Sequence, residues 1–257
     1  MSLLASKSPW YATGKSLGLL YLFILTGLFL DSYHFVKITA HAQWFANVAM
    51  FIVTGIVFFN VTKRNQEQMI TAILIAIIGE YLFSIVLGMY TYRLENVPHY
   101  VPLGHALVYV GVLYFTKTAF TKLHKSLLEK ILTIIVLVYA SVFLIFENDV
   151  FGFVLTILTV FILRKRLRER MFYLVMYLTV AYLEIIGTNF ICWEWPSTAF
   201  DFFSFLPSEN PPSGISFFYF GLDLGCLWLY KKRHKIAWKR MKNLRMIRLM
   251  SPQKKEL

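Results

Sequence analysis

Charged side chains and cysteines are scarce in this sequence of 257 residues: 16% of the residues are charged and two are cysteine, whereas 58% are hydrophobic. A soluble domain carries about 25% charged residues, and the mean hydropathy of +0.59 is also too high for one. The composition therefore excludes a soluble globular protein. Cys192 and Cys226 are expected at different depths in the membrane, so no disulfide is predicted.

The apolar residues form long runs that short polar or basic segments separate. Lipid offers the backbone no hydrogen-bond partner outside a helix, and about 20 residues are needed to cross a bilayer. We therefore predict an all-α, polytopic membrane protein with about eight transmembrane helices. The expected helices cover residues 16–33, 43–61, 68–90, 101–120, 129–146, 150–163, 171–195 and 213–230.

The net charge of +12 has an uneven distribution along the chain. All of the 26 basic residues except Lys37 and Arg93 fall on one side of the membrane if both termini are cytoplasmic. Because Lys and Arg in short loops set the orientation of membrane proteins, we predict cytoplasmic termini in a cell (inner) membrane. The positive charge then reflects topology and contact with membrane lipids, and no nucleic-acid partner is predicted.

Two stretches of the chain resemble each other and predict an internal duplication. Glu80 precedes Tyr90-x-Tyr92, as Glu184 precedes Trp193-x-Trp195; Pro102, Gly104, Tyr109 and Gly111 recur 110 residues later as Pro212, Gly214, Tyr219 and Gly221. This pattern indicates two parallel four-helix repeats, residues 1–125 and 126–230, followed by a basic cytoplasmic tail, residues 231–257. The alternative is that such residues recur by chance, because they are common in membrane proteins.

Ionisable residues inside the expected helices are the candidates for a site. At about 1.5 Å per residue, Glu80, Glu184 and Asp223 lie near the midplane and His105 lies close to the outer surface. Such groups are costly in lipid unless they are paired or hydrated, so each one indicates function. Further polar residues share their helix faces or lie nearby in an outer loop. They are Tyr109, Thr188 and Tyr219 as substrate contacts, and His99 as a substrate contact or a solvated interfacial residue.

These polar faces are expected to meet in one cavity that opens toward the outer side. A carboxyl group held away from water favours its protonated form, which suits a proton donor or carrier. The alternative is that Glu80 and Glu184 are neutral and only join helices by hydrogen bonds. The sequence has no His-x-x-x-His or Glu-x-x-His pair and no phosphate-binding loop, so no metal site is predicted and no cofactor is identified.

Part of the sequence resembles the polytopic membrane hydratases of carotenoid biosynthesis. The similar elements are Glu80, Gly88-Met-Tyr90-Thr-Tyr92, Val97-Pro98, Val101-Pro102-Leu-Gly-His105 and Glu184-Ile-Ile-Gly187-Thr188. The chain differs in carrying His105 where a Trp is expected. The resemblance implies acid-catalysed addition of water to a terminal isoprenoid double bond.

Three functions are consistent with these residues. The first is a membrane enzyme of lipid metabolism that acts on a hydrophobic lipid or isoprenoid, with Glu80 or Glu184 as general acid, His105 as base or orienting partner, and Asp223 with Tyr219 tuning them. The second is a proton- or cation-coupled transporter, in which midplane carboxylates carry the ion. The third is a non-catalytic membrane assembly subunit whose buried acids pair with a partner.

Overall fold

The computed structural model describes residues 9–236, 238–240 and 243. The described chain is mostly helical, as predicted. Its helices are α1 (Pro9–Phe29), α2 (Tyr33–Val36), α3 (Ala42–Asn60), α4 (Lys63–Glu80), the π-helix η1 (Tyr81–Val86), α5 (Tyr100–Thr116), α6 (Ala119–Leu123), α7 (Lys125–Glu147), α8 (Val150–Arg164), α9 (Arg170–Asn189) and α10 (Ser216–Arg233). Of the expected basic tail, residues 237, 241–242 and 244–257 lie outside the described residues.

Four segments are long and apolar enough to cross a membrane: Ala42–Asn60, Lys63–Val86, Lys125–Glu147 and Arg170–Asn189. Shorter apolar helices cover Leu17–Phe29, Tyr100–Thr116 and Val150–Arg164. Each of the eight predicted ranges overlaps one long helix, although the ends of the helices differ from the prediction. These helices are α1, α3, α4, α5, α7, α8, α9 and α10. Length and composition thus support a membrane protein with at least these four candidate spans.

Two of the predicted helices end earlier than expected. The helix expected over 68–90 changes from α to π geometry after Glu80 and ends before Gly88, whose φ of +58° is a conformation that glycine adopts without strain. The helix expected over 171–195 ends at Asn189. Short strands follow these ends: β1 (Thr91–Tyr92) pairs with β2 (Trp193–Glu194), and β3 (Thr198–Ala199) pairs with β4 (Phe203–Pro207).

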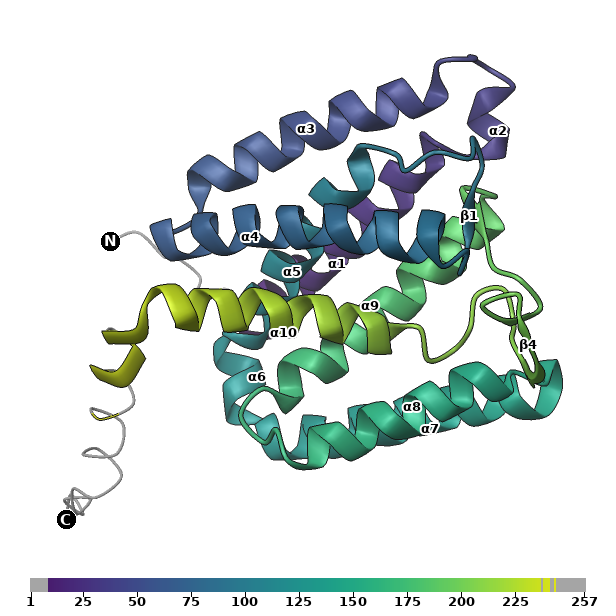
Figure 1. The fold of residues 1–257 in the computed structure, drawn as a ribbon. Helices are drawn as coiled ribbons and strands as arrows, with labels where there is room; N and C mark the ends of the chain where they lie inside the picture. Colours follow the sequence, from purple (N-terminus) through teal and green to yellow (C-terminus); the bar gives the residue numbers. More distant parts are fainter. Residues whose placement is uncertain (1–8, 237, 241–242, 244–257) are drawn as a thin grey trace, which may run out of the picture.

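The helices α4, α5, α9 and α10 form the centre of the molecule. Helix α4 packs against α5 and α10, and α9 packs against the same two helices. Helices α1 and α3 cover α5 on one side, whereas α7 and α8 pack beside α9 and α10 on the other (Figure 1). This arrangement brings the third and fourth long helices of the chain against the seventh and eighth.

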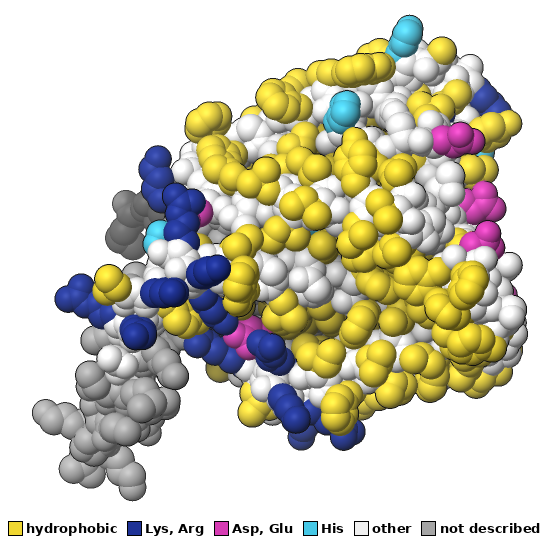
Figure 2. Space-filling view, in the orientation of Figure 1, with side chains coloured by type: hydrophobic (Ala, Val, Ile, Leu, Met, Phe, Trp, Pro, Cys, Tyr) yellow, Lys and Arg dark blue, Asp and Glu magenta, His cyan; other side chains and the backbone are white. Residues whose placement is uncertain are grey.

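The two ends of the molecule differ in charge. The β1–β2 and β3–β4 pairs lie at one end, and the helix ends nearest the two chain termini lie at the other (Figure 1). Lys and Arg side chains gather at the end with the termini, and several Asp and Glu side chains occupy the opposite end (Figure 2). Hydrophobic side chains cover much of the face between the two ends, as a lipid-facing surface requires (Figure 2).

Two buried aspartates anchor the loops at the acidic end. Asp31, which is fully buried, forms an ion pair with Arg93 and accepts a hydrogen bond from the Tyr100 hydroxyl at 2.9 Å. Asp149, also fully buried, begins α8 and accepts the backbone N–H of Gly152 at 3.0 Å and of Ser213 at 2.7 Å. Asp31 follows α1 and holds the segment that leads into α5, and Asp149 follows α7 and holds the segment that leads into α10.

Candidate functional site

A cavity of about 80 Å³ lies between the central helices, on the side of the β1–β2 pair. A buried water needs roughly 10–15 Å³ of cavity volume, so this cavity has room for a few waters or a slender part of a ligand. Its walls are mostly apolar and aromatic, and come from α1, α3, α4, η1, α5, α9, α10 and the two short strands. The polar side chains at its wall are Glu80, Tyr90, Tyr92, Tyr100, His105, Glu184, Trp193, Trp195 and Tyr219.

Glu80 is the last residue of α4 and the first carboxyl group of the cavity. It is 5% exposed, and its Oε2 accepts the hydroxyl of Tyr92 at 2.7 Å and the hydroxyl of Tyr90. The π-helical turn and Gly88 fold the chain back, so that a residue ten positions later reaches the carboxylate. Among the described residues, no hydrogen bond reaches the other oxygen, Oε1.

Tyr90 and Tyr92 lie in the segment after η1, outside the candidate spans. Burial, and then the nearby Glu80 carboxylate, raise the pKa of both phenols well above the ordinary value. Both hydroxyls therefore remain protonated at any physiological pH and act as donors to Glu80.

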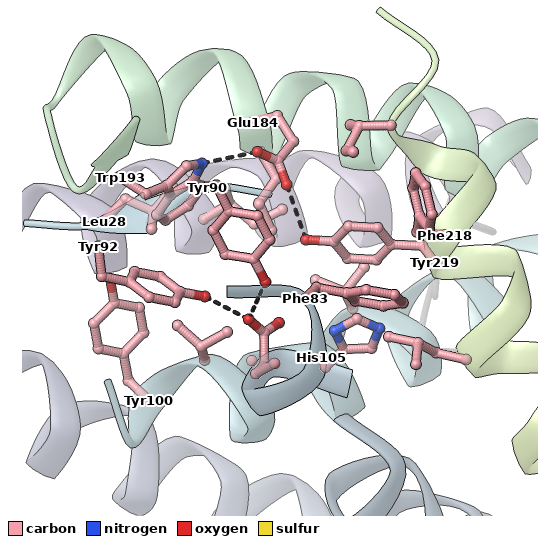
Figure 3. Close-up of a pocket in the computed structure, with 18 of the residues that line it drawn as sticks. Leu28, Phe83, Tyr90, Tyr92, Tyr100, His105, Glu184, Trp193, Phe218 and Tyr219 are labelled. Atoms are coloured by element: carbon pink, nitrogen blue, oxygen red, sulfur yellow. Dashed lines mark hydrogen bonds between the residues drawn. The ribbon is translucent and has the colours of Figure 1, made fainter. Parts of the chain in front are cut away.

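Glu184 is the second carboxyl group of the cavity and is 3% exposed. Its Oε2 accepts the indole N–H of Trp193 at 2.8 Å and of Trp195 at 3.1 Å. Its Oε1 accepts the hydroxyl of Tyr219 at 3.0 Å (Figure 3). Gly187 lets Trp193 approach α9, because a Cβ at this position would lie 2.1 Å from the indole ring. Both oxygens of Glu184 are thus occupied by donors from β2, from Trp195 directly after it, and from α10.

The segments that carry these donors pair with each other. Strands β1 and β2 are antiparallel, with Thr91 opposite Glu194 and Tyr92 opposite Trp193. The rings of Tyr90 and Trp195 also lie together, 4.6 Å between centroids. Positions 103 residues apart therefore exchange places across the pair, as positions related by a local two-fold axis between Thr91 and Glu194 would do. Glu80 receives both of its aromatic donors, and Glu184 two of its three, from the segment that follows the same helix in the chain.

His105 joins the site from the first turns of α5. Its ring stacks on Tyr219 with 4.6 Å between centroids and 8° between planes (Figure 3). The ring atom Nε2 is buried and has no hydrogen-bond partner among the described residues. His105 thus presents an unused nitrogen in a cavity that also contains two carboxyl groups.

Four of the predicted site residues meet in the cavity, namely Glu80, His105, Glu184 and Tyr219. The other four lie outside its lining. Asp223 and Tyr109 are buried one helical turn beyond Tyr219 and His105, close enough to each other to interact electrostatically. One oxygen of Asp223 has no hydrogen-bond partner in the described part of the chain.

The remaining two predicted residues have other surroundings. The hydroxyl of Thr188 donates to the backbone carbonyl of Glu184 at 2.9 Å, within α9. His99 is exposed at the start of α5, where its ring contacts Trp44 edge to face. Neither side chain reaches the cavity, because helix geometry turns Thr188 toward its own backbone and the loop turns His99 outward.

Sequence reasoning missed the role of the aromatic pairs and of the two aspartates. The Tyr-x-Tyr and Trp-x-Trp spacing is the signal for the first, since alternate residues of a strand point to one face. For Asp31 and Asp149 the signal is weaker: each is an acid that lies two residues after the end of a long helix, α1 or α7. Within the described residues, no three His, Cys, Asp or Glu side chains form a group that could hold a metal ion.

No protein-family model, curated protein or solved structure matches this chain. The function must therefore be argued from the chemistry of the cavity. A carboxyl group with one free oxygen, a second carboxyl group and an imidazole face an apolar space lined by aromatic rings. The carboxyl groups and the imidazole can transfer a proton to a hydrophobic molecule in this space. The electron-rich faces of the aromatic rings stabilise a positive charge that develops there.

Proposed function

We propose that the protein is a multi-pass enzyme of the cytoplasmic membrane that transfers a proton to a lipid or isoprenoid substrate. The observation that carries this proposal is the meeting of Glu80 and Glu184 in one apolar cavity, the first with two aromatic donors and the second with three. Glu184 does bond across a helix interface, to Tyr219 of α10. Carboxyl groups that served only to join helices, however, would not line an open space beside an unpaired imidazole.

Glu80 is the general acid in this proposal. Its Oε1 is free, so a proton on that atom can pass to an alkene carbon, whose π electrons form the new C–H bond. Both oxygens of Glu184 accept hydrogen bonds, so this group has no free oxygen from which to present a proton. Glu184 instead places its charge density near the carbocation that the first step leaves.

His105 completes the reaction as a base. Its unpaired Nε2 accepts a proton from a water molecule that adds to the carbocation, and the proton then returns to Glu80, so that protons balance over the cycle. Tyr219 holds the imidazole by stacking and holds Glu184 by its hydroxyl. This is the water addition that the resemblance to carotenoid hydratases implies. The narrow cavity suits the end of an isoprenoid chain.

We further propose that the chain consists of two parallel four-helix repeats, with eight membrane crossings and both termini in the cytoplasm. The support comes from the local two-fold relation of β1 and β2, from the matching packing of α4 with α10 and α5 with α9, and from the two aspartate anchors. A two-fold axis along the membrane normal relates such repeats. It would place the two carboxyl groups on either side of one cavity.

The test of the enzyme proposal measures proton transfer into lipids. Purified full-length protein is incubated in deuterium oxide with membrane lipid extract, and mass spectrometry records deuterium or water incorporation. We expect incorporation with the wild type and with Glu95→Gln, an exposed control acid, and a loss of at least 100-fold with Glu80→Gln. Full incorporation by a folded Glu80→Gln protein would contradict the role of Glu80.

Proton-coupled transport is the second candidate, and Asp223 is the observation that favours it. This buried carboxyl group has an oxygen without a hydrogen-bond partner among the described residues. It lies between the cavity and the basic end, where a proton pathway would need a proton-carrying side chain. Proteoliposomes loaded with a pH-sensitive dye distinguish the two functions. Proton flux that Asp223→Asn abolishes, without any lipid product, would replace the enzyme proposal by transport.

A further inference from the structure

A second hollow lies at the basic end of the molecule, remote from the cavity. It is a groove of about 490 Å³ between α7, α8 and α9. Its floor is apolar and includes Leu137, Val160 and Leu174. Its rim carries three cationic side chains, Lys130, Arg164 and Arg170. The groove thus combines a basic mouth with a hydrophobic channel.

The ends of three helices meet at this mouth. Helix α7 begins at Lys125, α8 ends at Arg164 and α9 begins at Arg170. Two of these helices belong to the candidate spans Lys125–Glu147 and Arg170–Asn189, so their first turns lie where a membrane helix meets the lipid headgroups. The floor then runs from headgroup level into the hydrocarbon region.

One cation at the mouth, Arg170, is held in place by the protein itself. The guanidinium of Arg170 donates to the backbone carbonyl of Leu163 at 3.1 Å and to that of Arg164 at 3.2 Å, which holds it at the rim. The acid that also lines the groove, Glu129, pairs with Lys125 at 3.5 Å. Its charge is therefore matched, and Lys130, Arg164 and Arg170 leave an excess of positive charge.

We propose that this groove binds an anionic phospholipid. The phosphate lies among Lys130, Arg164 and Arg170, and one acyl chain follows Leu137, Val160 and Leu174. The positive charge of the rim favours an anionic headgroup, and burial against the apolar floor favours a ligand with an acyl chain. The groove also opens sideways to the bilayer, since Ile134 on its wall is 61% exposed. A free phosphate ion would leave the apolar floor uncovered.

The test uses the full-length protein in dodecyl maltoside micelles. Thermal unfolding is followed while dioleoylphosphatidylglycerol, dioleoylphosphatidylcholine or inorganic phosphate is titrated, because a ligand that binds only the folded state raises the melting temperature. The test variant is Lys130→Gln with Arg164→Gln. The control variant, Lys122→Gln with Lys165→Gln, removes two exposed charges near the same end that do not line the groove.

We expect phosphatidylglycerol to stabilise the wild type and the control variant, and the test variant to bind it roughly 30-fold more weakly. Equal stabilisation of the test and control variants overturns the groove assignment. If phosphatidylcholine raises the melting temperature as much as phosphatidylglycerol does, the groove does not require an anionic headgroup. If inorganic phosphate alone does so, the ligand of the groove is not a lipid. Should the double variant fail to fold, Lys130→Gln alone changes one exposed side chain and is expected to weaken binding about fivefold.

Discussion

Gly187 determines at residue scale how Glu184 is held. The helix face at this position lies so close to Trp193 that a Cβ would meet the indole carbons at 2.1 and 2.2 Å. The absence of a side chain therefore allows the indole N–H to reach the carboxyl group at 2.8 Å. Sequence alone placed Gly187 in a helix, where glycine is unfavourable, without a reason for it.

The first prediction concerns Gly187→Ala. The added methyl group must displace the Trp193 ring, so we expect the unfolding free energy to fall by about 1–3 kcal/mol and the tryptophan fluorescence to shift to longer wavelength. The control is Gly221→Ala in α10, where nothing lies within 4 Å of the added atom and alanine favours the helix. Equal stability of the two variants would contradict the close approach of Trp193.

The second prediction concerns Tyr92→Phe. This change removes one of the two hydroxyl donors of Glu80 and keeps the ring. We expect a loss of about 1–2 kcal/mol in thermal unfolding in detergent, because a buried oxygen loses a partner. Tyr81→Phe, at a tyrosine that is 53% exposed, is the matched control and should be neutral. A neutral Tyr92→Phe would show that this hydroxyl does not hold Glu80.

The ends of the elements were the part of the fold that sequence predicted least well. Apolar runs located the long helices, because each run needs a helix to satisfy its backbone in lipid. They did not reveal the π-helical turn after Glu80 or the strands at Thr91 and Trp193. Tyr and Trp are as frequent at the end of a membrane helix as in a loop, so the pattern alone could not distinguish the two.

The third prediction concerns the link between two elements that Asp149 makes. This side chain caps α8 through Gly152 and holds the segment before α10 through Ser213. We expect Asp149→Ala to lower the unfolding free energy by about 3 kcal/mol, because several buried N–H groups lose their acceptor. Residues 196–208 should also become sensitive to limited proteolysis.

The control for Asp149 is an ordinary helix cap. Thr62 begins α4 and accepts the N–H of Asn65, so Thr62→Ala should cost about 1 kcal/mol and leave the loop resistant to protease. If the two variants lose equal stability and show the same cleavage, Asp149 is a local cap and does not anchor α10.

At the scale of the whole molecule, the separation of charge predicts orientation. Both native cysteines are buried, with exposures of 0% for Cys192 and 1% for Cys226, so they give little background in labelling experiments. The loop positions Asp201 and Arg168 are exposed and lie at the acidic and basic ends. Each can therefore report one side of the membrane.

The fourth prediction is that a membrane-impermeant maleimide added to intact cells labels the Asp201→Cys protein and not the Arg168→Cys protein. Lysed cells should label both. The expectation follows from the retention of basic loops in the cytoplasm. Labelling of Arg168→Cys in intact cells would reverse the orientation, and labelling of both would contradict the placement of the two ends on opposite sides.

Composition and periodicity were sufficient for the helical class, for membrane association and for three of the buried acids, Glu80, Glu184 and Asp223. Lipid leaves the backbone few alternatives and makes a charged residue inside an apolar run conspicuous. Tertiary structure alone decided which acids share a space. Glu80 and Glu184 meet because distant segments pair at β1 and β2, whereas Asp223 is buried outside the lining of the cavity although its helix also lines it. Such contacts depend on how helices rotate against one another, and a linear pattern of apolar residues does not specify that rotation.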